Sequence, residues 1–269
     1  MPIQVTESKI KDLISIVQLV SNFIRTSSFN KVQELDNMTI FEEPLVGIAA
    51  ADDPLFMRLK NAEVVGDHHM TPREWFPEAK TVISYFLPFS LRVRQSNRLN
   101  NEQPSSEWLY GRIEGEDLNN AVRKFLMGAI GETGRKAMVP PNDPRYKTLN
   151  NRSSWSERHV AYIAGLGTFN LSKSLITRKG CAGRFGSIVT DLSLSPTERP
   201  YQSIYEYCNN CGACIPRCPA AAISKDGKEH PPCDNFLNDI KQLFAPRYGC
   251  GKCQTAVPCE AAVPHKKII

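Results

Sequence analysis

The sequence predicts an α/β protein made of two parts, residues 1–200 and residues 201–269. Segments typical of strands alternate with segments typical of helices through the first 195 residues, which indicates a layered α/β core. Eight of the nine cysteines lie in the second part, which has little apolar sequence of its own. The stretch 195–201 contains two prolines and is expected to link the two parts.

The elements of the first part follow from the spacing of apolar residues. Apolar positions that recur about every 3.6 residues predict helices at 7–25, 117–130 and 155–164. Short apolar or β-branched runs predict strands at 45–50, 81–87 and 187–194, with a short strand or a loop at 138–141.

The second part contains the spacing C-x2-C-x2-C-x3-C-P from Cys208 to Pro219. This is the run with which bacterial ferredoxins hold cubane iron–sulfur clusters, and its fourth cysteine serves a second cluster. Pro219 cannot continue a regular turn, so we expect it to direct Cys218 away from the other three thiols. Zinc sites use paired C-x2-C units separated by a longer gap, so the run favours iron and sulfide over zinc or disulfides.

Eight cysteines are enough for two four-iron clusters. We assign the first cluster to Cys208, Cys211, Cys214 and Cys259. We assign the second cluster to Cys218, Cys233, Cys250 and Cys253. A plain two-cluster ferredoxin would carry cysteine at the positions of Ala256 and Glu260, so the second half of the module is altered. Cys181 is left over, and we interpret it as a small buried apolar filler.

The composition is that of an ordinary globular chain. It has 269 residues, 41% hydrophobic residues and a net charge of +5, which permits an acidic partner without requiring one. We find no signal peptide and no apolar run long enough to span a membrane. Nine cysteines without an export signal argue for metal and against disulfides, so we expect a cytoplasmic protein.

Most of the chain resembles the epoxyqueuosine reductases, which are relatives of the corrinoid reductive dehalogenases. The stretches that carry this likeness are Glu157-Arg158 with Ala164-Gly165-Leu166-Gly167, the glycine-bearing stretch 180–186 with 188–192, the cysteine run, and Cys233 with 248–254. Residues 46–49 and 75–84 are similar more weakly. Many unrelated proteins share the iron–sulfur motif, so its combination with the two glycine-bearing stretches makes the likeness specific.

This resemblance implies a nitroreductase-like α/β core that binds cobalamin, capped by a two-cluster ferredoxin-like domain that delivers electrons to the cobalt. In those terms the cofactor-binding residues are Gly165, Leu166, Gly167, Gly180, Gly186 and Asn151. A glycine lets the backbone approach a flat macrocycle where a Cβ would collide. For any single glycine, a turn or a helix end is the alternative explanation.

The chain departs from that family at the position of the proton donor. The family's catalytic aspartate corresponds to Asn151, and an amide is not a general acid. Asn151 is therefore either a hydrogen-bonding residue above the cofactor or a turn residue. Tyr162 is a second candidate donor, with a core aromatic as the alternative. His68 and His69 are either cobalt ligands or exposed loop residues.

The resemblance implies an oxidoreductase. We expect electrons to pass from two [4Fe-4S] clusters to cobalamin and then to a small-molecule or modified-nucleoside substrate, supplied by a low-potential ferredoxin or flavodoxin. The helical-repeat region with which the family grips tRNA does not follow Cys259, so tRNA is disfavoured as a substrate but stays open. One alternative is an electron-transfer or activating protein that reduces a separate corrinoid or flavin protein. Another is a structural member without the cofactor.

Overall fold

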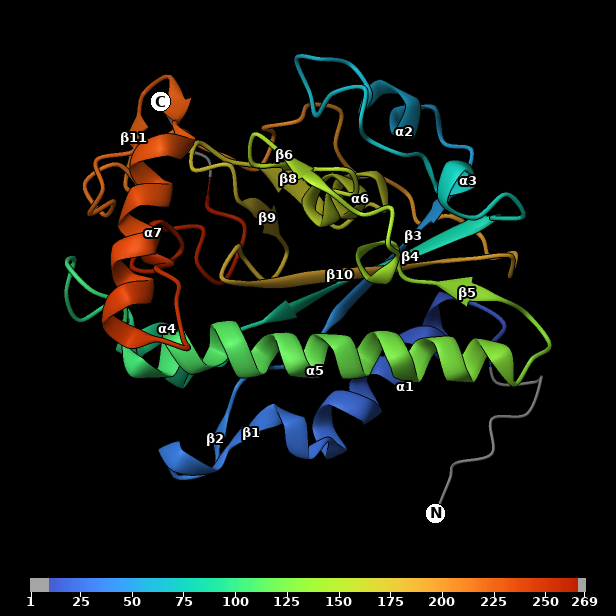
Figure 1. The fold of residues 1–269 in the computed structure, drawn as a ribbon, viewed down its shortest axis with the longest axis horizontal. Helices are drawn as coiled ribbons and strands as arrows, with labels where there is room; N and C mark the ends of the chain where they lie inside the picture. The colour runs from blue at the N-terminus through green and yellow to red at the C-terminus, as the bar shows by residue number, and fades with distance from the viewer. Residues whose placement is uncertain (1–9, 266–269) are drawn as a thin grey trace.

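The computed structural model describes residues 10–265 and has a four-stranded sheet at its centre, in the order β3-β4-β10-β5 (Figure 1). The strands are β3 (Leu45–Ala50), β4 (Thr81–Pro88), β5 (Ala137–Met138) and β10 (Gly183–Thr190). Every pairing is antiparallel, and Ile83 stands opposite both Ile48 and Ile188. The mixed α/β class predicted from the sequence is confirmed.

Helices cover both faces of this sheet. They are α1 (Leu13–Thr26), α2 (Pro54–Arg58), α3 (Pro72–Trp75), α4 (Leu91–Ser96), α5 (Ser106–Gly131), α6 (Glu157–Ile163) and α7 (His230–Phe244). In Figure 1 the long α5 and α1 lie on one side of the sheet, and α2, α3 and α6 lie on the other. The remaining strands form four small hairpins, β1 (Lys31–Val32) with β2 (Met38–Thr39), β6 (Thr148–Leu149) with β7 (Arg152–Ser153), β8 (Gly167–Phe169) with β9 (Leu175–Thr177), and β11 (Ile223–Ser224) with β12 (Gly227–Lys228).

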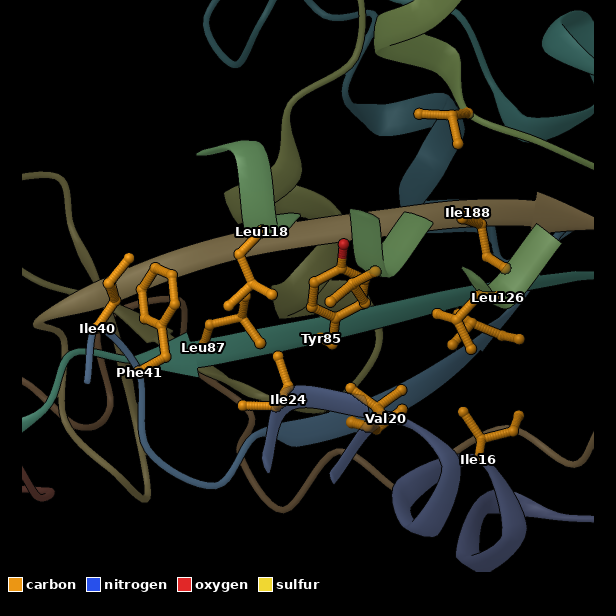
Figure 2. Close-up of a cluster of buried hydrophobic side chains, with 14 of the residues drawn as sticks. Ile16, Val20, Ile24, Ile40, Phe41, Tyr85, Leu87, Leu118, Leu126 and Ile188 are labelled. Carbon is orange, nitrogen blue, oxygen red and sulfur yellow. The ribbon is translucent and has the colours of Figure 1, made fainter. Parts of the chain in front are cut away.

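Alternation along the strands divides the core into two layers. Ile83 and Tyr85 of β4 pack toward α1 and α5. Val82, on the opposite face of the same strand, packs with α2, α3 and α6. Figure 2 shows the first layer, in which Val20 of α1 and Leu118 of α5 meet across Tyr85. Successive side chains of a strand point to opposite faces, so a strand covered on both sides is buried throughout. This explains why all eight residues of β4 are buried.

The predicted strands at 45–50 and 81–87 are confirmed as β3 and β4, and β10 begins before the predicted position 187. Helix ends differ more, because caps set them. Asp12 accepts a hydrogen bond from the Ser15 N–H and starts α1 there, so residues 10–12 are not helical. The remainder of that predicted start, residues 7–9, lies outside the described residues. Ser105 caps α5 in the same way and starts it well before residue 117.

Helix α7 was not predicted, because the sequence around it is largely polar. It begins with two prolines in its first turn, and buries only Ile240 fully. Figure 1 shows it standing at the end of the sheet where α4 and the start of α5 lie. None of the helices within residues 10–265 is long and apolar enough to span a membrane.

His69 lies in the second core layer, where it stacks against Trp155 with ring centroids 6.1 Å apart. It is fully buried, and neither ring nitrogen has a hydrogen-bond partner in the structure. The expectation of an exposed loop residue is therefore wrong for His69, whereas the His68 ring lies 2.9 Å from the carbonyl of Arg152. Burial lowers the pKa of His69 to about 4.

We predict that stability falls as the pH drops from 6.5 toward 4. The unfolded chain takes up a proton on His69 near pH 6.5 and the folded chain only near pH 4. The contribution of His69 to stability is therefore fully present above the unfolded pKa. Between pH 8 and pH 5.5, protonation of this residue in the unfolded chain lowers the free energy of unfolding by about 1.4 kcal/mol. The measurement is urea unfolding at both pH values for the wild type and for His69→Phe, which should lose less. An equal loss in both proteins would assign the effect elsewhere, for example to His159, whose pKa burial lowers to about 3.

Candidate functional site

All nine cysteines are free, and eight of them line two cavities. A small cavity is lined by Cys208, Cys211, Cys214 and Cys259. A large cavity is lined by Cys218, Cys233, Cys250 and Cys253, among other residues. The structure therefore brings together the same two sets of four that the sequence assigned, here called the first and second thiol sets. Among the described residues no three His, Cys, Asp or Glu side chains are arranged to hold a single metal ion.

The two thiol sets are neighbours. Cys214 of the first set and Cys253 of the second interact electrostatically. Burial raises the pKa of the Cys214 thiol to about 12, and burial does the same for Cys250. Thiolates are the metal ligands, so loading these sites must release protons.

The large cavity has a volume of about 630 Å³ and lies between the α/β core and the cysteine-rich part. Its core side is formed by α5, the first turn of α6 and the start of β10, and its other side by the second thiol set and α7. Trp108, Phe185 and Tyr248 supply aromatic surface. The volume is in the range of cofactor and small-molecule sites.

Buried charges form the core side of this cavity. The Arg123 guanidinium contacts Glu116 at 2.9 Å and Glu157 at 3.1 Å, and the Ser187 hydroxyl donates to Glu157 at 2.6 Å. Glu157 thus pairs with Arg123, and burial raises the pKa of its carboxyl. The Arg123 and Arg184 side chains line the cavity, whereas their Nε atoms are buried in the protein without a hydrogen-bond partner.

Of the glycines predicted to approach a macrocycle, Gly183 of the stretch 180–186 lines the large cavity, whereas Gly165, Gly167, Gly180 and Gly186 are not among its lining residues. A Cβ at Gly165, Gly167 or Gly180 would meet the carbonyl oxygen of Glu198, Ile176 or Glu260, respectively. A Cβ at Gly186 would meet the Tyr85 ring, and Leu166 packs with Leu45 and Phe86. These glycines thus permit close contacts within the protein, and their approach to a macrocycle stays a prediction.

The two candidate proton donors also lie outside the residues that line the large cavity. Asn150 and Asn151 are the two loop residues of the β6–β7 hairpin, and both have positive φ, as a type I′ turn requires. The exposed Asn151 amide donates to Asp234 of α7. Tyr162 packs against the rings of Phe169 and Tyr201, as its core-aromatic alternative requires.

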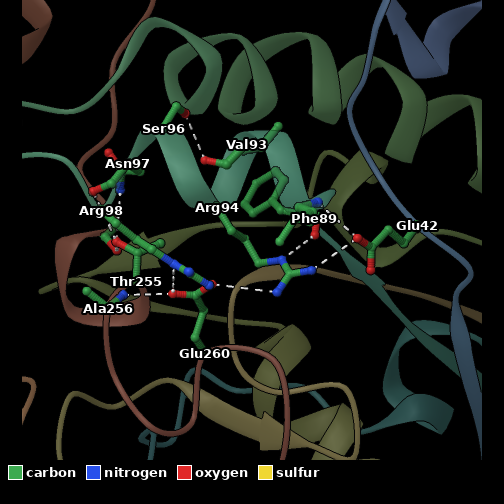
Figure 3. A network of polar contacts seen from close by, with 12 residues as sticks. Glu42, Phe89, Val93, Arg94, Ser96, Asn97, Arg98, Thr255, Ala256 and Glu260 are labelled. Atoms are coloured by element: carbon green, nitrogen blue, oxygen red, sulfur yellow. Dashed lines mark hydrogen bonds and ion pairs between the residues drawn. The ribbon is translucent and has the colours of Figure 1, made fainter.

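A buried carboxylate fixes the segment that carries Cys259. Glu260 is 3% exposed and lies between Arg94 and Arg98 of the α4 region, with 3.0 Å from the Arg98 Nε to its Oε2 (Figure 3). Its carboxylate also accepts a hydrogen bond from the Ala256 N–H at 2.7 Å. Arg94 forms a second ion pair, with Glu42 at 3.0 Å. Glu260, at a position where a ferredoxin would carry cysteine, thus forms an ion pair that attaches the cysteine-rich part to the α/β core.

The comparisons with known proteins agree with this arrangement. Residues 201–224 match the 4Fe-4S binding domain family. The epoxyqueuosine reductase of Staphylococcus aureus is 24% identical over 201 residues, which is 70% of this chain and 50% of the relative. The chain therefore spans about half the length of that relative.

Two solved structures share the fold. The structure of a reductive dehalogenase, which suggested a mechanism for B12-dependent dehalogenation, has a TM-score of 0.54 at 15% identity and covers 82% of this chain and 30% of the other. An epoxyqueuosine reductase bound to an epoxyqueuosine-modified tRNA-Tyr stem loop has a TM-score of 0.51 at 18% identity, covering 93% and 66%.

Fold and sequence together define an α/β protein with a C-terminal 4Fe-4S binding domain. The predicted resemblance is confirmed: the chain is similar in sequence to epoxyqueuosine reductases, and its fold is similar to those of an epoxyqueuosine reductase and a reductive dehalogenase. The sequence interpretation missed Arg123, Arg184 and Trp108 at the large cavity. The signals available in the sequence were the place of Arg184 within the glycine-bearing stretch 180–186 and the place of Arg123 within the predicted helix 117–130.

We predict that Glu260→Gln destabilises the protein by about 3 kcal/mol, because it leaves Arg94 and Arg98 without their shared buried carboxylate. The matched control is Glu42→Gln, which removes the half-exposed partner of Arg94 and should cost about 1 kcal/mol or less. Urea midpoints of the anaerobically purified proteins provide the comparison. Equal losses in the two variants would mean that the ion pair does not anchor the module.

Proposed function

We propose that the protein is an iron–sulfur oxidoreductase in which two [4Fe-4S] clusters pass electrons to a cobalamin in the large cavity, for reduction of a small-molecule or modified-nucleoside substrate. The observation that carries this proposal is the division of eight cysteines into two sets of four around two adjacent cavities. The electrons would come from a low-potential ferredoxin or flavodoxin.

The surroundings of the thiols fit anionic clusters. Although burial opposes its charge, the pKa of Lys228 is raised by the neighbouring Cys253 and Cys233. Lys228 thus supplies a cation and a hydrogen bond at the second set. The Asn170 amide donates to Cys259 at the first set, at 3.7 Å. Such donors to ligand sulfurs stabilise the cluster charge. The clusters supply single electrons when bound.

The large cavity fits a cofactor rich in hydrogen-bond acceptors. The guanidinium groups of Arg123 and Arg184 in the lining would suit the side-chain carbonyls that a corrinoid carries, and Trp108 and Phe185 would offer apolar contact. Cobalamin, when bound, supplies low-valent cobalt for the reduction of the substrate. The lining residues would exclude water and orient the cobalamin. Glu157 is the buried carboxyl suited to donate a proton, because burial raises its pKa.

Asn151 favours a second function, in which the protein only transfers electrons to a separate corrinoid or flavin protein. The amide stands at an exposed hairpin turn and has no proton to give. A chain that lacks the family's acid but retains its thiol sets would still deliver electrons.

We expect eight irons per chain after anaerobic reconstitution. Cys208→Ala and Cys250→Ala each remove a ligand of a different cluster and should each reduce the iron to about four. Iron analysis and electron paramagnetic resonance measure this. Zinc in place of iron, or four irons in the wild type, would contradict the assignment of two clusters.

Cobalamin binding distinguishes the two functions. Stoichiometric uptake with a base-off cobalt(II) resonance is the result expected for the reductase. Arg184→Met, which removes a guanidinium from the cavity lining, should weaken uptake about tenfold, which corresponds to about 1.4 kcal/mol. Lys179→Met, a change outside the cavity lining, is the control. Two intact clusters with no uptake would favour the electron-transfer protein.

The role of position 151 is tested by Asn151→Asp. Gain of epoxyqueuosine reduction would show that the pocket is shared with the epoxyqueuosine reductases and that only the acid was lost. Asn150→Asp, the other residue of the same turn, is the matched control and should gain nothing. If neither variant gains activity, the substrate differs from that of the family.

A further inference from the structure

Cys181 is the ninth thiol, and the proposed function does not use it. It lies between the β8–β9 hairpin and the start of β10 and is 1% exposed. Its Sγ is 3.8 Å from the Sγ of Cys259, a member of the first thiol set. The prediction of a buried residue agrees with this position, but a purely apolar filler would not be expected to contact a cluster thiol.

The backbone holds this contact in place. The Cys181 N–H donates to the Cys259 carbonyl at 2.9 Å, and the next N–H, of Ala182, donates to the Glu260 carbonyl at 3.2 Å. A Cβ at Gly180 would meet that same carbonyl of Glu260, so the two segments are in direct backbone contact. Glu260 is itself fixed by Arg94 and Arg98. The two backbone segments that carry these sulfurs therefore cannot separate without movement of β10 or of the ion-paired segment.

The roles of the two sulfurs follow from their surroundings. Cys181 is enclosed by protein and no Lys, Arg or His side chain is recorded in contact with it among the described residues, so its neutral S–H form is favoured. Cys259 is partly exposed and lines a cavity with three other thiols. The geometry thus has Cys181 as donor and Cys259 as acceptor, and the Asn170 amide is a second donor to the same sulfur at 3.7 Å.

We propose that Cys181 is a positioning residue that donates an S–H hydrogen bond to Cys259 and thereby raises the reduction potential of the cluster bound at the first thiol set. This rests on the proposed function in one respect, that the set holds a cluster. Reduction adds negative charge that the ligand sulfurs share, so a donor to one of them favours the reduced form. Among the described residues no hydrogen bond joins Cys181 to a thiol of the second set, so the potential of the cluster there should change less.

The test is a redox titration of the reconstituted protein followed by electron paramagnetic resonance, together with iron analysis, for the wild type, Cys181→Ala and Cys181→Ser. Alanine removes the donor, whereas serine retains one. We expect all three proteins to hold eight irons. In Cys181→Ala the equilibrium constant for one-electron reduction of one cluster should fall about tenfold, equivalent to about 59 mV toward negative potential. Cys181→Ser should shift less, and the other cluster serves as the internal control.

Three outcomes would overturn the proposal. Unchanged potentials in Cys181→Ala would mean that the contact does not tune the cluster. Loss of about four irons from the Ala and Ser variants, with Cys259→Ala retaining eight, would make Cys181 the ligand in place of Cys259. Equal shifts in the Ala and Ser variants would assign the effect to packing. Absence of any cluster from the wild type would instead contradict the proposed function, so the two failures are distinguishable. If Cys181→Ala does not fold, Cys181→Ser still tests the direction, because an O–H donor is predicted to keep the potential near that of the wild type.

Discussion

The arrangement of the thiols depends on one buried ion pair, between Glu260 and the arginines Arg94 and Arg98. The cysteine-rich part has few apolar residues of its own, and its buried apolar cluster is formed around Cys214, Ile223 and Val257. A group this small contributes little hydrophobic free energy. Its attachment to the core is therefore polar, through Glu260 and through the Arg217 guanidinium, which donates to the carbonyls of Asn97 and Thr255. A buried charge pair of this kind favours one relative position, because any other leaves charges unpaired.

The large cavity is a consequence of that attachment. The core presents α5 and the start of β10, the cysteine-rich part presents α7 and the second thiol set, and neither side encloses the space alone. The polar groups that face it, Arg123 and Arg184, belong to the core and are themselves held by Glu116 and Glu157. Charged side chains held by ion pairs are suited to orient a ligand, since little freedom is lost when it binds.

Spacing in the sequence predicted the features that depend on local chemistry. The division of the thiols follows from C-x2-C-x2-C-x3-C-P, because the reach of short loops limits which sulfurs can share a cluster. The strands at 45–50 and 81–87 follow from apolar runs. The glycine-bearing stretches were recognised, but a glycine reveals only that something approaches closely. At Gly167 and Gly180 the approaching groups are backbone carbonyls from other segments. His69, Arg123 and Glu260 were missed or misread, because the burial of a polar residue depends on contacts distant in sequence.

Strand β10 connects the central sheet to the first thiol set, and this connection bears on the lifetime of the folded protein. It is one of the two inner strands, paired with both β4 and β5, and its first residues directly follow Cys181 and its contacts with Cys259 and Glu260. Any group bound between the sulfurs of the first set adds its binding free energy to the folded state alone. Oxidative damage that strips such a group would thus loosen the sheet at its centre, and the cell's proteolytic machinery would meet an opened chain. In this fold, exposure to oxygen and abundance of the protein are coupled through a single strand.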